Sequence, residues 1–293
     1  MKISGFTFLR NAQMLGYPFI ESITSILPIV DEFIIALGPC EDRTEIMIRN
    51  INSSKIRIIH TTWNENMKDR GYVYGQQKMI AQFNCMGDWA FYLEGDEVVH
   101  ENDLNKIVDC CKKYKDNNAV EAIAFNYIHF YGNRKSYLDS PSWYRKEARI
   151  IKNSIRTYAP DGLFWLVLDK NKIGRYPKAI CCDVNIYHYG WVRSEEEMNL
   201  KSKKIQKFWG KKHSKIIYEN IDQNIIKEFK GTHPIAVQKW LPKEDNVFIA
   251  NKNYKLTRKD MKNRVLKKIE SIFHIDLSKK HFIEIKKQNL QWK

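Results

Sequence analysis

Hydrophobic and polar positions alternate along the chain up to Asn118 in short blocks that predict strands and helices in turn. Apolar runs predict strands at 3–9, 32–37, 56–60 and 89–93. Apolar residues spaced three and four apart predict helices at 18–27, 43–51, 74–85 and 102–114. Strands that alternate with helices of this length are typical of a mostly parallel sheet covered on both faces. We therefore expect an α/β, Rossmann-like first half.

The pattern changes after Asn118. Apolar runs predict further strands at 119–131, 143–151 and 179–189, with irregular segments between them. From Ser194 the spacing becomes helical, and a serine followed by three glutamates is typical of a helix N-cap with an acidic first turn. Further helices are predicted at 216–229, 234–241 and 257–273. We expect two parts, an α/β domain over 1–190 and a basic, mainly helical C-terminal extension over 191–293.

The charge distribution bears on possible partners. The 293 residues carry a formal net charge of +15, and lysines concentrate after position 200, with Lys203, Lys204, Lys211 and Lys212 in two clusters. Such a field attracts nucleic acid, an anionic membrane surface or an anionic substrate. No nucleic-acid motif accompanies the charge, so no nucleic acid is expected. Peripheral contact of these lysines with an anionic membrane and a merely solubilising surface both stay open.

The chain shows no segment that would take it into or across a membrane. No apolar run approaches the ~18 residues that a membrane span needs, and the short apolar run at 3–9 is not typical of a signal peptide. The six cysteines include two adjacent pairs but no zinc-type Cys-x-x-Cys spacing. We therefore expect a cytoplasmic protein. Peripheral attachment to the inner face of the membrane stays open.

The most informative motif lies at 87–97. A short apolar run at 89–93 ends in three carboxylates, Glu94, Asp96 and Glu97, with Gly95 among them. Open α/β sheets bind ligands at the carboxyl ends of their strands. One or two carboxylates together with substrate phosphates are the usual ligands of Mg²⁺ in such sites. The motif therefore indicates Mn²⁺ or Mg²⁺ that carries a nucleotide diphosphate, against the simpler interpretation of an acidic turn.

Four segments in order, 4–11, 31–44, 74–88 and 94–97, resemble family 2-type glycosyltransferases of the GT-A fold. The resemblance covers about residues 3–190, and Glu94-Gly95-Asp96-Glu97 stands where that family has its Asp-x-Asp motif. The sequence departs from the family at Glu94, which replaces an aspartate, and at the loop 38–42, where many relatives are rich in serine. The resemblance implies a GT-A nucleotide-sugar-binding and catalytic domain.

The resemblance also implies site residues. It gives a metal site formed by Glu94, Asp96 and His188, with Asp96 as the direct ligand and Glu94 acting through water or the ribose. It implies nucleotide-sugar contacts from Arg10, Asn11, Asp42, Gln77, Glu94 and Arg193. Simpler interpretations stay open: Asp42 as a helix N-cap, His188 as a core histidine, and the remaining side chains as solvated.

An inverting transfer needs a carboxylate that removes the proton of the acceptor hydroxyl. Asp161 is the candidate, although Pro160-Asp161-Gly162 is also a turn signature, and Glu147 and Glu97 are the alternatives. The sequence as a whole predicts a metal-dependent glycosyltransferase that uses a nucleotide-diphosphate sugar, with a UDP-sugar expected, and a glycan, lipid-linked or protein acceptor. The alternatives are a nucleotidyltransferase of related fold, or a non-catalytic basic module that binds anionic membrane or nucleic acid.

Overall fold

Four parallel strands form one half of a large mixed sheet, as the sequence predicts. The computed structural model describes residues 1–212, 214–243 and 246–286. Its parallel strands lie side by side in the order β4, β1, β2, β3. Their bounds are Ile3–Leu9 for β1, Glu32–Leu37 for β2, Ile56–His60 for β3 and Trp89–Tyr92 for β4. All four lie where the apolar runs predict strands.

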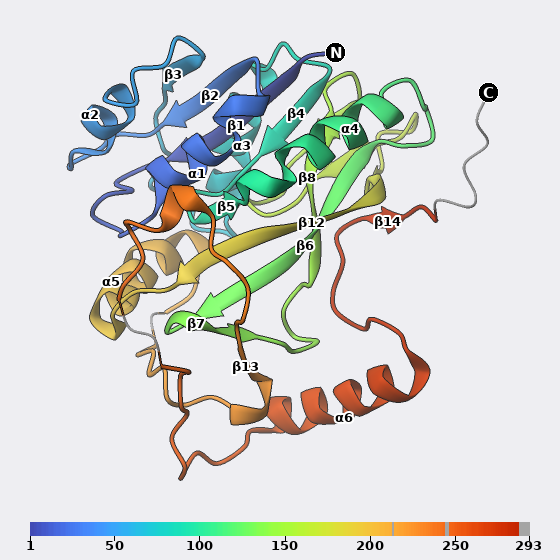
Figure 1. The fold of residues 1–293 in the computed structure, drawn as a ribbon. Helices are drawn as coiled ribbons and strands as arrows, with labels where there is room; N and C mark the ends of the chain where they lie inside the picture. Colours follow the sequence, from blue (N-terminus) through green and yellow to red (C-terminus); the bar gives the residue numbers. More distant parts are fainter. Residues whose placement is uncertain (213, 244–245, 287–293) are drawn as a thin grey trace.

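Helices cover both faces of this half of the sheet (Figure 1). They are α1 (Phe19–Ile26), α2 (Thr44–Arg49), α3 (Tyr72–Phe83) and α4 (Leu104–Tyr114), with 3₁₀ turns at Leu27–Ile29 and Glu101–Asp103. Each lies within a few residues of a predicted helix. The fold is therefore α/β, with a sheet flanked by helices.

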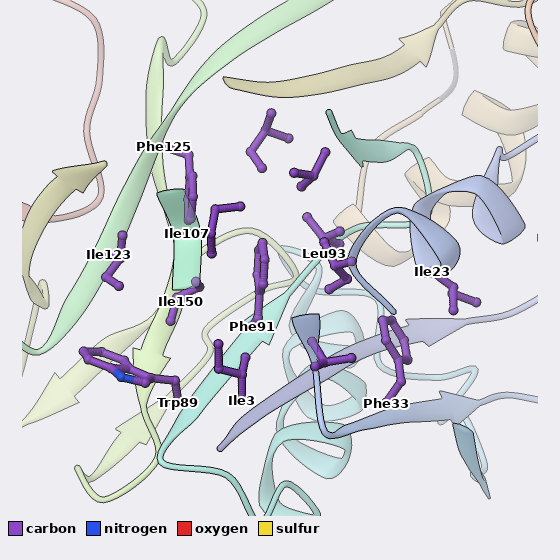
Figure 2. Close-up of a cluster of buried hydrophobic side chains, with 14 of the residues drawn as sticks. Ile3, Ile23, Phe33, Trp89, Phe91, Leu93, Ile107, Ile123, Phe125 and Ile150 are labelled. Atoms are coloured by element: carbon purple, nitrogen blue, oxygen red, sulfur yellow. The ribbon is translucent and has the colours of Figure 1, made fainter. Parts of the chain in front are cut away.

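The buried core follows the two-residue period of the strands. In β4, Trp89 and Phe91 point to the face covered by α1 and α4, whereas Ala90 and Tyr92 point to the face covered by α3. Figure 2 shows the first of these clusters, in which side chains of β1, β2 and β4 meet Ile23 of α1 and side chains of more distant strands. Burial on both faces explains why these strands read as continuous apolar runs.

The other half of the sheet is largely antiparallel. The path continues from β4 through β8 (Lys146–Lys152), β6 (Ala122–Tyr131), β7 (Asn133–Leu138) and β13 (Ile226–Glu228). The long strand β12 (Lys178–Trp191) pairs with β6 and also with two short strands, β5 (Glu97–Val99) and β14 (Ile283–Glu284). A separate small sheet is formed by β9 (Thr157–Tyr158), β10 (Leu166–Leu168) and β11 (Gly174–Arg175).

The C-terminal part is less helical than predicted. Helix α5 (Glu195–Gln206) begins at Ser194 with a capping box, and α6 (Arg258–Phe273) begins at Thr257 in the same way. The predicted helix at 216–229 is wrong, because that segment holds a 3₁₀ turn (Gln223–Ile225) and then β13, which pairs with β7. The helix predicted at 234–241 is reduced to a 3₁₀ turn at Ile235–Val237, and another 3₁₀ turn, Lys207–Trp209, follows α5.

Two features bear on the expected organisation. Strands β13 and β14 belong to the main sheet, so the segment after residue 190 is built onto the first part through backbone hydrogen bonds. The division at residue 190 stays a prediction. None of the helices in the described ranges has the length and the apolar character that crossing a membrane requires.

Candidate active site

A cavity of about 520 Å³ opens at the carboxyl ends of β1 and β4. Gly95 lies between its acidic residues, and a Cβ added there would lie 3.0 Å from Leu9 Cδ2, so the loop packs closely on the end of β1. The cavity wall includes Glu94 and Asp96 from this loop, Arg10 and Asn11 from the end of β1, and His188 from β12. The structure therefore brings together five of the residues that the sequence singles out.

Asp96 is the buried acidic centre of the cavity. Its Oδ2 accepts a hydrogen bond of 3.0 Å from Lys201 Nζ, and its Oδ1 lies 3.6 Å from His188 Nε2. Burial alone would raise the pKa of Asp96, but the Lys201 ammonium, which also donates a hydrogen bond to it, outweighs burial and holds the pKa below its usual range. Burial lowers the pKa of Lys201 to about 8 against the opposing effect of Asp96. Asp96 is therefore a carboxylate at neutral pH.

His188 is oriented by a second histidine. His129 lies opposite it on the parallel strand β6, and the two Nδ1 atoms are 3.0 Å apart. His129 Nε2 lies 2.7 Å from the Tyr144 carbonyl oxygen, which can only accept, so His129 Nε2 carries the proton. Burial lowers the pKa of both histidines, which makes both rings neutral. His129 Nδ1 therefore accepts from His188 Nδ1, and the His188 Nε2 lone pair faces Asp96.

Gly190 leaves space beside this pair. A Cβ added at Gly190 would lie 2.7 Å from His188 Nε2 and 3.0 Å from Asp96 Oδ2. Contacts of this length are too close for a real side chain, so only glycine keeps the space beside the lone pair and the carboxylate open. An unprotonated histidine nitrogen and a carboxylate oxygen are suitable ligands for Mn²⁺.

The other two carboxylates of the motif are held by Arg149. This fully buried guanidinium donates to Glu97 through Nη2 (2.7 Å) and Nε (2.9 Å), and Nη2 also donates to Glu94 Oε1 (3.0 Å). Tyr127 adds a hydrogen bond of 2.8 Å to Glu97. Burial and the neighbouring Glu97 raise the pKa of Glu94 to about 8. Glu97 is fully buried and does not line the cavity, which argues against the catalytic role that the sequence suggests for it.

Arg149 and His129 are residues that the sequence interpretation misses. The signal for Arg149 is a charged residue inside the apolar strand run 148–151. The signal for His129 is weaker, because it depends on the pairing of β6 with β12, which the sequence does not state.

Cationic side chains also line the cavity. Lys201 and Lys204 of α5 and Lys207, just after it, line the cavity together with Arg10. Glu65 accepts a hydrogen bond of 2.8 Å from Lys207 and also pairs with Arg10, so it links two of these cations. The cavity thus combines a buried carboxylate and an imidazole with several ammonium and guanidinium groups.

Aromatic rings complete the lining. Lys201 Nζ lies 4.3 Å from the centre of the Tyr17 ring, and the Arg10 guanidinium lies 5.3 Å from the Trp63 ring. These contacts position the cations without neutralising them. Asn11 adopts a left-handed backbone (φ 51°), a conformation that asparagine tolerates better than most residues, and its side chain accepts a hydrogen bond of 2.7 Å from Glu41 N.

The remaining predicted site residues lie outside the cavity lining and make structural contacts. Asp42 accepts from Met14 N (2.8 Å) and Thr44 N (3.0 Å), so it is a turn residue just before α2, whose N-cap is Arg43 and not Asp42 as the simpler interpretation expects. Gln77 is buried and bonds Thr61 Oγ1 (2.5 Å) and the Thr62 carbonyl (3.0 Å).

Arg193 and Asp161 also lie beside the cavity rather than on its wall. Arg193 donates to the Leu15 carbonyl, and its guanidinium lies 5.3 Å from the Tyr17 ring. Asp161 Oδ1 accepts from Leu163 N at 2.8 Å, which closes the predicted turn, whereas Gly162 and Leu163 line the cavity.

The described residues contain no group of three or more His, Cys, Asp and Glu side chains arranged to hold a metal ion. Of the three predicted ligands, Asp96 and His188 lie together, and Glu94 is hydrogen-bonded to Arg149. Two protein ligands supplemented by substrate phosphates are enough for Mg²⁺. The donor set, the orientation of the lone pair and the space over Gly190 therefore fit a divalent cation.

No protein-family model and no curated protein matches this sequence. Among solved structures, the chain is similar to glucosyl-3-phosphoglycerate synthase from Mycobacterium tuberculosis in complex with Mn²⁺, UDP and phosphoglyceric acid (18% identity, 43% of each chain, TM-score 0.31). It is also similar to S. aureus TarS (13% identity, 70% of this chain and 39% of TarS, TM-score 0.39). A further match is a mycobacterial protein (13% identity, 70% of this chain and 72% of that one, TM-score 0.41).

The chain thus matches less than half the length of the synthase and of TarS. At these TM-scores the likenesses carry no argument about function, which rests on the cavity itself.

Proposed function

We propose that this chain is a glycosyltransferase of the GT-A type that transfers a sugar from a nucleotide-diphosphate sugar to an acceptor hydroxyl with inversion. A UDP-sugar is the donor we favour. The observation that carries the proposal is the cavity at the carboxyl ends of β1 and β4, whose lining combines Asp96 and His188 with several cationic side chains. That combination suits a diphosphate bound between a divalent cation and ammonium groups.

In this proposal Asp96 and His188 would hold Mn²⁺ or Mg²⁺, with Glu94 as a ligand acting through water or the ribose. The bound cation would neutralise the diphosphate leaving group and ease cleavage of the glycosidic bond. Lys204, Lys207 and Arg10 would contact the phosphates directly. Lys201 would share Asp96 with the cation, or move from it to the phosphates when the donor binds.

The nucleoside would lie near the end of β1. Arg10 and Asn11 line the cavity there and support the predicted nucleotide contact. For Asp42, Gln77 and Arg193 we propose indirect roles, because each fixes a backbone segment next to the cavity. Gln77, for example, anchors the segment that leads to Trp63, which is part of the cavity wall.

Asp161 remains our candidate for the general base. It begins the turn whose next two residues line the cavity, and its hydrogen bond to Leu163 N fixes the carboxylate in place. Glu97 is not retained, because its oxygens are occupied by Arg149 and Tyr127. The acceptor is proposed to be a glycan, a lipid-linked molecule or a protein, and peripheral contact with an anionic membrane is part of the proposal.

A panel of nucleotide sugars tests the function. With Mn²⁺ present, the true donor should raise the melting temperature and be slowly hydrolysed, because ligand binding stabilises the folded state by mass action. Asp96→Asn should abolish both effects, whereas Asp169→Asn on the exposed surface should preserve them. If no nucleotide sugar shifts the melting temperature of the folded protein, the proposal fails.

A further inference from the structure

Helix α6 turns its polar side toward the protein. In this helix, all of whose residues the structure describes, only Asn263 is buried. Arg264 forms two hydrogen bonds with the buried Asp222, at 2.7 Å and 2.8 Å. Lys267 Nζ lies 2.8 Å from Asp139, and Glu270 accepts a hydrogen bond of 2.7 Å from Arg145. Several ion pairs therefore attach α6 to the rest of the molecule, and two of its apolar residues, Leu266 and Ile269, are also partly buried.

The opposite side of α6 is apolar and faces solvent. Met261, Val265 and Ile272 recur at intervals of four and seven residues, which places them on one side of the helix. The exposed fractions of Ile272 and Phe273 are 70% and 66%. The apolar face of α6 consists of the exposed residues Met261, Val265, Ile272 and Phe273, and the exposed Ile275 and Leu277 follow just after the helix. In Figure 1, α6 lies at the lower edge of the molecule, below β7 and β13.

A helix on the surface of a globular protein normally has the opposite orientation, with its apolar residues against the core. Large contiguous exposed apolar patches mark sites of interaction with a protein or a membrane. The apolar face of α6 therefore calls for a partner, and the charges around it indicate which kind.

The charges that border the apolar face are positive. Three exposed cations of α6, Arg258, Lys262 and Lys268, lie on the same side of the helix as the apolar face or beside it. The two acidic residues of the helix are engaged elsewhere: Asp260 caps the first turn and accepts from Tyr254, and Glu270 pairs with Arg145. An apolar face bordered by cations is complementary to the interface of an anionic lipid bilayer. Two copies of this face would instead bring like charges together.

We propose that the apolar face of α6 docks on an anionic lipid membrane, with the helix lying in the plane of the interface. This proposal does not depend on the sugar-transfer function. It also moves the membrane contact away from the lysines that the sequence suggests. Of those, Lys204 lines the active-site cavity, where the proposed function assigns it to the donor phosphates.

Vesicle co-sedimentation of the full chain tests the proposal. Vesicles of equal parts phosphatidylcholine and phosphatidylglycerol should bind the protein, pure phosphatidylcholine should bind it at least tenfold more weakly, and added salt should release it. The triple variant Met261→Gln, Ile272→Gln, Phe273→Gln should lose at least tenfold in binding. Glutamine keeps the helix propensity of these positions.

A matched triple variant, Ile46→Gln, Phe83→Gln, Met86→Gln, removes equally exposed apolar side chains elsewhere and should bind as the wild type does. A third variant, Arg258→Gln, Lys262→Gln, Lys268→Gln, tests the cations alone and should also weaken binding to the anionic vesicles. The proposal is overturned if the wild type ignores anionic vesicles at low salt, or if both α6 variants bind as the wild type does. It is equally overturned if light scattering shows a wild-type dimer that the apolar α6 variant dissociates, which would assign this face to a second copy of the chain.

Discussion

Two arginines four residues apart organise two different regions of this molecule. Arg149 in β8 is fully buried and holds Glu97 and Glu94 beneath the candidate active site. Arg145, just before β8, has 27% of its side chain exposed and binds Glu270, Asp139 and Asp276 where α6 attaches. Both are networks of one guanidinium with several carboxylates. They differ in their access to water.

This difference determines what each network does. In the buried network no water can replace a lost partner, so the carboxylates depend on Arg149 to stay in place. Around Arg145 water and salt can solvate the separated charges, so each ion pair contributes little. The first network can therefore fix the geometry of a site, and the second can hold a helix whose other side is free for a partner.

The largest expected effect comes from Arg149→Met. Removal of one partner from a buried ion pair leaves an uncompensated charge on Glu97, which typically costs about 3–5 kcal/mol of unfolding free energy. Urea unfolding measures the change. Arg175→Met, in the more exposed pairs with Glu121 and Asp169, is the matched control and should cost far less. Equal losses of unfolding free energy in Arg149→Met and Arg175→Met would show that burial does not decide how much an arginine–carboxylate network contributes to stability.

The second prediction tests whether the site depends on the space beside His188. In Gly190→Ala the new methyl group must push His188 or Asp96 aside, because it would lie within 3.0 Å of both. A misplacement of about 1 Å in an active site can cost about 10²-fold in rate. Donor hydrolysis should fall by that order while the protein remains folded. Gly174→Ala, next to Tyr158 and away from the cavity, is the control and should keep its activity.

A smaller effect is expected for His129→Phe. The ring volume stays similar, but His188 Nδ1 loses its acceptor, so the proton is no longer confined to that nitrogen. Loss of such a partner typically lowers metal affinity by 10–100-fold. Calorimetric titration with Mn²⁺ alone measures it without any need for catalysis. His100→Phe removes another buried histidine, which bonds Thr232, and should leave the affinity unchanged.

An unchanged Mn²⁺ affinity in folded His129→Phe would contradict the role of His129 in orienting His188. Because this experiment measures metal binding, the result would not decide the sugar-transfer proposal, which the panel of nucleotide sugars tests separately. If the wild type itself bound no Mn²⁺ in the absence of donor, the comparison would be made with the nucleotide diphosphate present.

The two regions also differ in how far the sequence predicts them. The parallel strands β1, β2 and β4 are predictable because their apolar runs are buried on both faces of the sheet, whereas the edge strand β3 is only partly buried. The motif at 94–97 reveals Asp96 for the same reason, since it follows such a strand. The roles of Arg149 and His129 depend on which strands become neighbours, because Arg149 needs β8 beside β4 and His129 needs β6 beside β12.

The C-terminal part is harder to predict because its partners are distant in sequence. The segment at 216–229 has helical spacing, but β7 pairs with its end and Asp222 caps a 3₁₀ turn, so tertiary contacts override the local pattern. Helix α6 is predicted at the right place, yet its orientation follows from ion pairs with Asp139, Asp222 and Arg145. Those contacts leave no periodic signal in the sequence.

The smallest expected effect is that of Arg145→Met on the attachment of α6. Because the network is partly exposed, the change should cost only about 1 kcal/mol at neutral pH and low salt. The pH dependence follows from the carboxylates. Burial acts to raise the pKa values of Asp139 and Asp276, but both are lowered: Lys267 and Arg145 outweigh burial at Asp139, and hydrogen bonds from Ser278, with Lys280 and Arg145, outweigh it at Asp276. A lowered folded-state pKa gives stability that is present above the unfolded pKa, near 3.9, and is lost as the pH falls through the folded pKa.

The difference in unfolding free energy between wild type and Arg145→Met should therefore shrink below about pH 4 and also with added salt. Limited proteolysis at neutral pH localises the effect, since cleavage within α6 should be faster in Arg145→Met than in the wild type or in Arg175→Met. A difference that persists at low pH and high salt would mean that packing, not charge, attaches the helix. The Arg145 network would then not be weakened by water and salt, and the proposed difference between the Arg145 and Arg149 networks would be contradicted.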